Sequence, residues 1–186
     1  MIILGIDPGY AIVGYGIIEK NELGQVRVVD YGAINTPKEM SFPNRLVMIQ
    51  DGINALISRF KPDAVAIEEL FFNQNITTGI AVAEARGVIL CTATKGAKRV
   101  FEFTPMQIKQ SITGFGKADK KQVQYMTKTI LGLKSTPKPD DAADALAVAL
   151  CLAQTNTKLI NSDVQVFTNN NLKKMDLKEN LKRKIK

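Results

Sequence analysis

The chain has 186 residues, 45% of them hydrophobic, which favours one globular domain with a real core. It has no histidine, so Ser-His-Asp catalysis, Cys-His catalysis and imidazole metal sites are excluded. No apolar run reaches the roughly 20 residues of a membrane span, and the N-terminus lacks the basic start of a signal peptide. We expect a cytoplasmic protein with two small, buried cysteines, and any metal would be bound mainly by carboxylates, which suit magnesium or manganese.

The net charge of +7 is unevenly distributed along the chain. Residues 95–138 carry ten basic and two acidic side chains, whereas residues 139–155 carry three acids and no base. Residues 156–186 carry eight basic and three acidic side chains. A basic block beside acidic segments is typical of a polyanion-binding surface next to a carboxylate site, although ordinary solvated helix faces would give the same counts.

The chain opens with an apolar run, Ile2-Ile3-Leu4-Gly5-Ile6, which predicts a buried strand. The run stops at Asp7, and Pro8-Gly9 then turns the chain. A carboxylate at the end of a buried strand is costly unless something pairs with it. Asp7 therefore either hydrogen-bonds the turn that it begins or, with partner carboxylates from elsewhere, holds a metal.

A second strand-and-carboxylate arrangement follows after a meander and a helix. Residues 12–18 and 25–34 predict two further antiparallel strands, and residues 43–60 predict an amphipathic helix. Residues 64–67 form a short apolar run that ends in Glu68-Glu69. A parallel pairing of this run with the first strand would bring Asp7 beside one of the two glutamates, since neighbouring side chains on a strand point to opposite faces.

Two adjacent aromatics, Phe71 and Phe72, come next in a polar loop. Either both belong to the core, or one is exposed and stacks on a base. Residues 77–94 predict a helix whose small residues allow close approach of the sheet or of a partner subunit, and residues 99–103 predict a strand.

The basic block follows this strand. Residues 105–112 predict a short helix carrying Lys109, and residues 114–117 form a glycine-rich loop. Asp119 is placed to cap a helix that runs to about residue 131. Lysines at a glycine loop and a helix N-terminus suit phosphate contacts, and three gather at this junction: Lys117, Lys120 and Lys121.

An alanine-rich helix begins at Asp140 and is apolar all round, so we expect it to be buried. Asp141 and Asp144 are three residues apart and share a face of this helix. We interpret Asp140 as a helix cap, a role that would also suit Asp141. We therefore divide the chain into one globular domain of residues 1–155 and a basic, flexible tail of residues 156–186.

We therefore expect four carboxylates to lie close together: Asp7 and Glu68 at the ends of neighbouring strands, and Asp141 and Asp144 at the start of a buried helix. Crowded carboxylates repel one another, and divalent cations relieve that repulsion. Two such ions are the usual arrangement for phosphodiester hydrolysis. The basic block would then hold the backbone of a nucleic acid.

At this point the sequence resembles the RuvC Holliday-junction resolvases of the ribonuclease H-like superfamily, from residue 2 to about residue 153. The resemblance lies in five motifs, taken in order and spacing: Ile3-Leu4-Gly5-Ile6-Asp7-Pro8-Gly9, Ala66-Ile67-Glu68, Glu84-Ala85-Arg86-Gly87, Gln107-Ile108-Lys109-Gln110 and Asp141-Ala142-Ala143-Asp144-Ala145-Leu146. It implies an α/β fold with a mixed five-stranded sheet, in the order 3-2-1-4-5, flanked by helices.

The resemblance also implies an activity and its residues. A homodimer would make paired, magnesium-dependent nicks in a four-way DNA junction during recombination and repair, with two ions per site or manganese in their place. It would act with a branch-migration complex of RuvA and RuvB. The four acids fall on the family's catalytic and metal-binding positions, Phe71 on an aromatic that stacks at the junction centre, and Lys109 and Lys120 on lysines near the scissile phosphate. Lys117 and Lys121 are further DNA-binding candidates.

Three other functions are compatible with parts of this sequence. A Gly-Ile-Asp-x-Gly strand end also opens actin-like ATPases, but no second glycine-rich phosphate loop is present in this chain. A junction-binding protein without activity would not need all four acids. Another ribonuclease H-like nuclease would share the chemistry without the preference for junctions.

Overall fold

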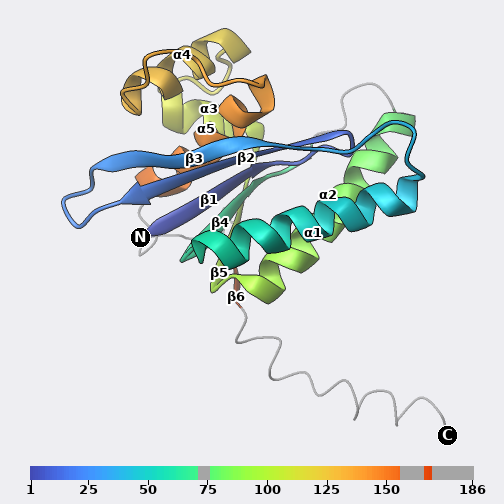
Figure 1. Ribbon diagram of the computed structural model, residues 1–186. Helices are drawn as coiled ribbons and strands as arrows, with labels where there is room; N and C mark the ends of the chain where they lie inside the picture. Colours follow the sequence, from blue (N-terminus) through green and yellow to red (C-terminus); the bar gives the residue numbers. More distant parts are fainter. Residues whose placement is uncertain (71–75, 156–165, 169–186) are drawn as a thin grey trace, which may run out of the picture.

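A mixed β-sheet forms the centre of the computed structural model, which describes residues 1–70, 76–155 and 166–168 (Figure 1). Three strands form an antiparallel meander: β1 (Ile2–Asp7), β2 (Ile12–Lys20) and β3 (Val26–Asn35). Two more strands, β4 (Ala64–Glu68) and β5 (Arg99–Phe103), continue the sheet in parallel with β1. The predicted order 3-2-1-4-5 is therefore confirmed.

A sixth strand was not expected. β6 (Val166–Thr168) pairs antiparallel with β5 at the edge of the sheet, so three residues of the segment predicted to be a tail extend the sheet. A strand of three residues in a polar segment is too short to show the alternating pattern by which strands are found in a sequence. The division between a domain of residues 1–155 and a tail stays a prediction.

Helices cover both faces of the sheet (Figure 1). α1 (Phe42–Phe60) and α2 (Ile76–Gly96) pack on one face around Leu4, Ile6 and Ile67. α3 (Pro105–Thr113), α4 (Lys120–Ile130) and α5 (Asp140–Gln154) pack on the other. Within the described residues, none of these helices is long and apolar enough to cross a membrane.

α5 is the helix that brings acids to the sheet, and it is buried on all sides from Ala145 to Ala153. Glycines on the strands beneath it allow very close contact. A Cβ added at Gly5 of β1 would lie 2.2 Å from the carbonyl oxygen of Ala145, and one at Gly14 of β2 would lie 2.1 Å from that of Asp141. These positions admit only glycine, so the sheet holds the first turns of α5 directly against β1 and β2.

Two smaller predictions were wrong. Cys91 is exposed on α2, whereas Cys151 is buried as expected. α2 is rich in small apolar residues all round, so its sequence does not indicate which side faces solvent. Asp140 is the first residue of α5 rather than its cap, and its carboxylate accepts a hydrogen bond from Lys138 Nζ at 2.6 Å.

Candidate active site

The parallel pairing of β1 and β4 brings two acids together at the carboxyl edge of the sheet. Ile6 pairs with Ile67, so Asp7 and Glu68 come next in neighbouring strands. Both side chains line one cavity of about 250 Å³. Glu69 is not part of its lining, which confirms that only one of the two glutamates faces Asp7.

α5 contributes the other two acids. Asp144 lines the same cavity, and Asp141 lies one turn earlier on the helix and raises the pKa of Asp7 through its charge. The four predicted acids therefore converge from three elements. Ile108 and Val123 form part of the apolar wall, together with Ala147. No role in the cavity could be predicted for these wall residues, because nothing in their local pattern distinguishes them from ordinary core residues.

The burial and the crowding of the acids raise the pKa values of two of them. Burial, followed by the charges of Glu68, Asp144 and Asp141, raises the pKa of Asp7 to about 8, against a smaller opposing effect of Lys120. Burial, followed by the charge of Asp144, raises the pKa of Glu68 to about 7. At neutral pH the pair therefore retains protons that isolated carboxyl groups would lose, and a cation in the cavity would displace them.

Two of the predicted lysines reach this cavity. Lys109 of α3 and Lys120 of α4 line it, and Lys120 Nζ lies 2.6 Å from Asp144 Oδ2. Lys121 is exposed in the first turn of α4, outside the cavity lining. Lys117 lies at a different cavity, described below. Phe71 falls outside the described residues, as does Phe72.

Capping boxes fix the starts of the two helices that carry these lysines. At α3, the Thr104 hydroxyl accepts from the Gln107 amide, and the Gln107 side chain accepts from the Thr104 amide. Asp119 and Gln122 make the same reciprocal pair at α4, which confirms Asp119 as its cap. Each box satisfies amides that the helix leaves unpaired. Lys120 is the first residue of α4, so its backbone position is set by this cap.

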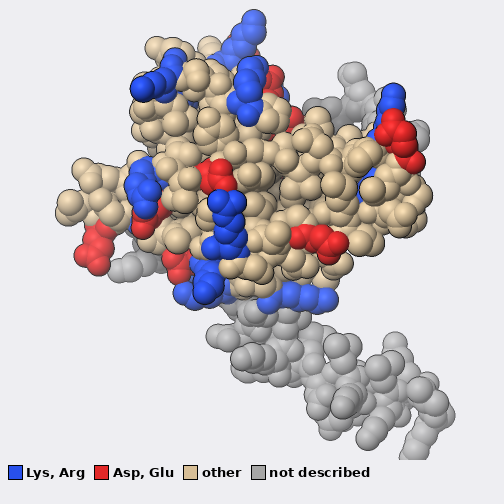
Figure 2. All heavy atoms as spheres, viewed as in Figure 1, with Lys and Arg blue, Asp and Glu red and all other residues tan. Residues whose placement is uncertain are grey.

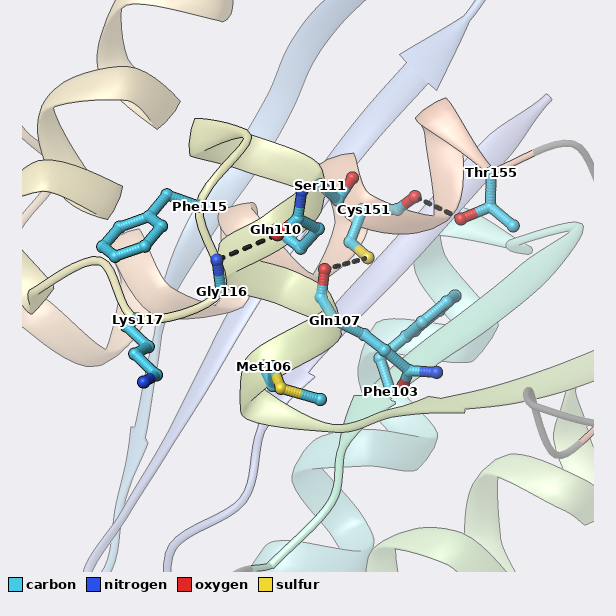
Figure 3. Close-up of a pocket in the computed structure, with 10 residues that line it drawn as sticks. All are labelled: Phe103, Met106, Gln107, Gln110, Ser111, Phe115, Gly116, Lys117, Cys151 and Thr155. Carbon is cyan, nitrogen blue, oxygen red and sulfur yellow. Dashed lines mark hydrogen bonds between the residues drawn. The ribbon is translucent and has the colours of Figure 1, made fainter.

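A larger cavity, of about 710 Å³, lies on the other side of α3 (Figure 3). Phe103, Met106 and Phe115 make much of its wall, and Lys117 lies at its rim beside Phe115. Among the residues that the structure describes, no acidic side chain lines it. Its apolar character and its lack of carboxylates make the smaller cavity, and not this one, the candidate centre of hydrolysis.

The donor set of the smaller cavity fits a hard divalent cation, because it consists of carboxylate oxygens. As the side chains stand, the described residues contain no group of three or more such donors already arranged around one ion. Lys120 instead partly neutralises Asp144. The Lys120 ammonium contacts Asp144 Oδ2, so a cation bound through that oxygen would compete with this ion pair.

The basic side chains extend beyond the cavity. Figure 2 shows lysine and arginine side chains at the surface of the helical layer at the top of the view, where α4 lies, and also around the lower edge of the molecule. Acidic side chains lie among those on the lower part, and some also lie beside the basic side chains at the top. The helical layer that carries Lys120 and Lys121 is therefore suited to a polyanion.

The strand order and the carboxylates at the edge of the sheet define a nuclease of the ribonuclease H-like class. The sequence model of one family, described as "Crossover junction endodeoxyribonuclease RuvC", matches residues 3–152. The chain belongs to the RuvC family and is an endonuclease of that kind.

Named relatives support this assignment. The chain is 55% identical over 155 residues to the RuvC protein of Alkaliphilus oremlandii. The matched residues make up 83% of this chain and 94% of that relative. The Thermus thermophilus RuvC structure matches with a TM-score of 0.76 and 35% identity, over 83% of this chain and 94% of that one. A second Thermus thermophilus structure, RuvC in complex with a Holliday junction substrate, matches with the same TM-score and identity, over 81% and 92%.

Proposed function

We propose that this enzyme resolves four-way DNA junctions by magnesium-dependent hydrolysis, with Asp7, Glu68, Asp141 and Asp144 as its catalytic, metal-binding residues. The observation that carries the proposal is the convergence of Asp7, Glu68 and Asp144 in one cavity, with Asp141 near enough to raise the pKa of Asp7 through its charge. The raised pKa values of Asp7 and Glu68 support it, because they reflect burial and then repulsion between carboxylates, both of which a bound cation would offset. When bound, divalent ions supply the activation of water and the stabilisation of the leaving oxygen.

The protein's own residues position the DNA around that chemistry. Lys109 and Lys120 project into the cavity, where their charges would bind the phosphates that flank the scissile bond. Asp144 would be among the residues that hold the metal, and Lys120, which now pairs with it, would then be available to a phosphate. Lys121, at the exposed start of α4, and Lys117, beyond α3, would bind the backbone further away. Phe71 would stack at the centre of the junction.

The substrate and the assembly follow from symmetry. An open four-way junction presents two equivalent strands, and a homodimer with a two-fold axis presents two equivalent sites, so paired nicks result. The Thermus thermophilus relative solved with a Holliday junction supports this choice of substrate. We further propose that the enzyme acts in the reducing cytoplasm, with RuvA and RuvB as the branch-migration partners, in recombination and DNA repair.

The test compares a mobile four-way junction with a linear duplex of the same sequence, in magnesium. The proposal predicts symmetric nicks in the junction alone, which a DNA ligase can reseal because they carry 5′-phosphate ends. Equal cutting of both substrates would show a general ribonuclease H-like nuclease instead. Tight junction binding without any cutting, in magnesium or in manganese, would show a binding protein.

A further inference from the structure

Arg86 of α2 makes two contacts directly behind the candidate active site. Its Nε donates a hydrogen bond to the backbone carbonyl of Glu68 at 3.3 Å. Its Nη2 donates to Glu102 Oε1 in a close ion pair. The planar guanidinium therefore links β4 and β5 to α2, and it contacts the backbone of the very residue whose side chain lines the cavity.

Glu102 is the fourth of the five residues of β5 and is 5% exposed. It pairs with Ile67 across the sheet, and its neighbours Phe101 and Phe103 belong to the core cluster of the opposite face. Glu102 thus points away from the acids of the cavity, toward α2. A buried carboxylate at such a position needs a cation, and Arg86 is the one that the described residues bring into contact with it.

The peptide group between Glu68 and Glu69 is held at both ends. Arg86 binds its carbonyl oxygen, and its N–H donates to the carbonyl of Phe103 at 2.8 Å. Both atoms belong to one rigid plane, so fixing them fixes the backbone dihedral of Glu68 that precedes that plane. The direction in which the Glu68 carboxylate leaves the strand is thereby set. Without the bond from Arg86, the strand end would be held on one side only.

We infer that Arg86, supported by Glu102, is a positioning residue that aims the Glu68 carboxylate at the metal site. This inference rests on the proposed function, because it gives Glu68 its role. It also accounts for the Glu84-Ala85-Arg86-Gly87 segment, which carries part of the family resemblance but has no residue in the cavity lining.

The test is Arg86→Lys, in which an ammonium can still neutralise Glu102 but lacks the fork that reaches both oxygens. The matched control is Arg27→Lys, because Arg27 also forms an ion pair, with Glu19, in an exposed part of the sheet. We expect the single-turnover nicking rate of Arg86→Lys to fall at least tenfold, with the junction dissociation constant in calcium unchanged within twofold. Arg27→Lys should match the wild type in both.

A second measurement does not depend on activity. Amide hydrogen exchange of Glu69, in the protein without DNA or metal, should be at least fivefold faster in Arg86→Lys than in Arg27→Lys. The affinity of the DNA-free protein for Mn²⁺ should fall as well, at least threefold. If Arg86→Lys does not fold, Arg86→Gln/Glu102→Gln replaces it, because two neutral amides leave no buried charge, and the same outcomes are expected.

The inference would be overturned if a folded Arg86 variant matched the wild type in nicking rate, in Mn²⁺ affinity and in the exchange of the Glu69 amide. A fall in junction affinity equal to the fall in rate would also overturn it, since Arg86 would then act on the DNA. A wild-type protein that nicks no junction would refute the proposed function instead, and the exchange of Glu69 would still report whether Arg86 fixes the strand end.

Discussion

Replacing Gly5 with alanine should push α5 away from β1 and thereby move Asp144 away from Asp7. The added Cβ would lie 2.2 Å from the carbonyl oxygen of Ala145, 2.5 Å from the amide nitrogen of Ala149 and 2.7 Å from the Ala149 Cβ. Two of these three atoms are backbone, so a change of rotamer cannot relieve the clash. The helix itself has to move.

The size of the effect follows from these distances. Bringing the closest contact to roughly 3.2 Å requires α5 to move by about 1 Å. Overpacking of a core costs about 1–3 kcal/mol, and a clash with backbone belongs to the upper end of that range. For a domain of this size, about 3 kcal/mol lowers the melting temperature by roughly 6–12 °C. A displacement of about 1 Å within a catalytic group costs on the order of 100-fold in rate.

Thermal unfolding and single-turnover nicking of a four-way junction measure the two effects. The control is Gly87→Ala on α2, where an added Cβ meets no atom within 4 Å and alanine is the better helix former. We expect Gly87→Ala to retain the wild-type rate and melting temperature or to melt slightly higher. A Gly5→Ala protein with wild-type melting temperature and rate would refute the close packing of α5 on β1 as the device that assembles the site.

Two further predictions concern the charges of the site. The pKa of Asp7 is raised to about 8 in the folded protein, so the folded state keeps a proton that the unfolded chain has already released above about pH 4. The metal-free protein should therefore lose stability as pH rises from about 5 to 8. Melting temperatures across that range should fall for the wild type and fall less for Asp7→Asn; an equal fall would contradict the assignment. Lys120→Met should slow nicking at least tenfold yet strengthen Mn²⁺ binding, because it frees Asp144, whereas Lys138→Met, which breaks the exposed pair with Asp140, should do neither. Weaker Mn²⁺ binding by Lys120→Met would show that the lysine does not compete with the metal.

Most of the site could be predicted because its acids stand at places that local patterns identify. Asp7 and Glu68 each end an apolar strand, and parallel pairing then brings them together without further information. Asp141 and Asp144 are three residues apart on an alanine-rich helix, so their shared face follows from helix geometry. Each pattern shows which strand or helix carries the acid and at which end of that element the acid lies.

The rest depends on contacts between distant elements, which no local pattern reveals. Lys117 and Lys120 are three residues apart, yet Lys117 lines the larger cavity and Lys120 the smaller one, on the two sides of α3. Arg86 belongs to one of the motifs of the resemblance, but nothing in the sequence links it to Glu102, and only the packing of α2 on β5 joins them. The exposure of Cys91 likewise depends on which side of α2, a helix without one clear apolar face, packs on the sheet.

The most direct test of the account is the Asp7→Asn variant, measured for both nicking and binding of a four-way junction. Asparagine keeps the size of the side chain and removes only the charge that a divalent ion needs. The account predicts no detectable nicking in magnesium, with junction affinity and melting temperature at or above the wild-type values. Nicking by Asp7→Asn at the wild-type rate would contradict the assignment of the carboxylate cluster as the catalytic centre, and an unfolded variant would mean that Asp7 only supports the turn that it begins.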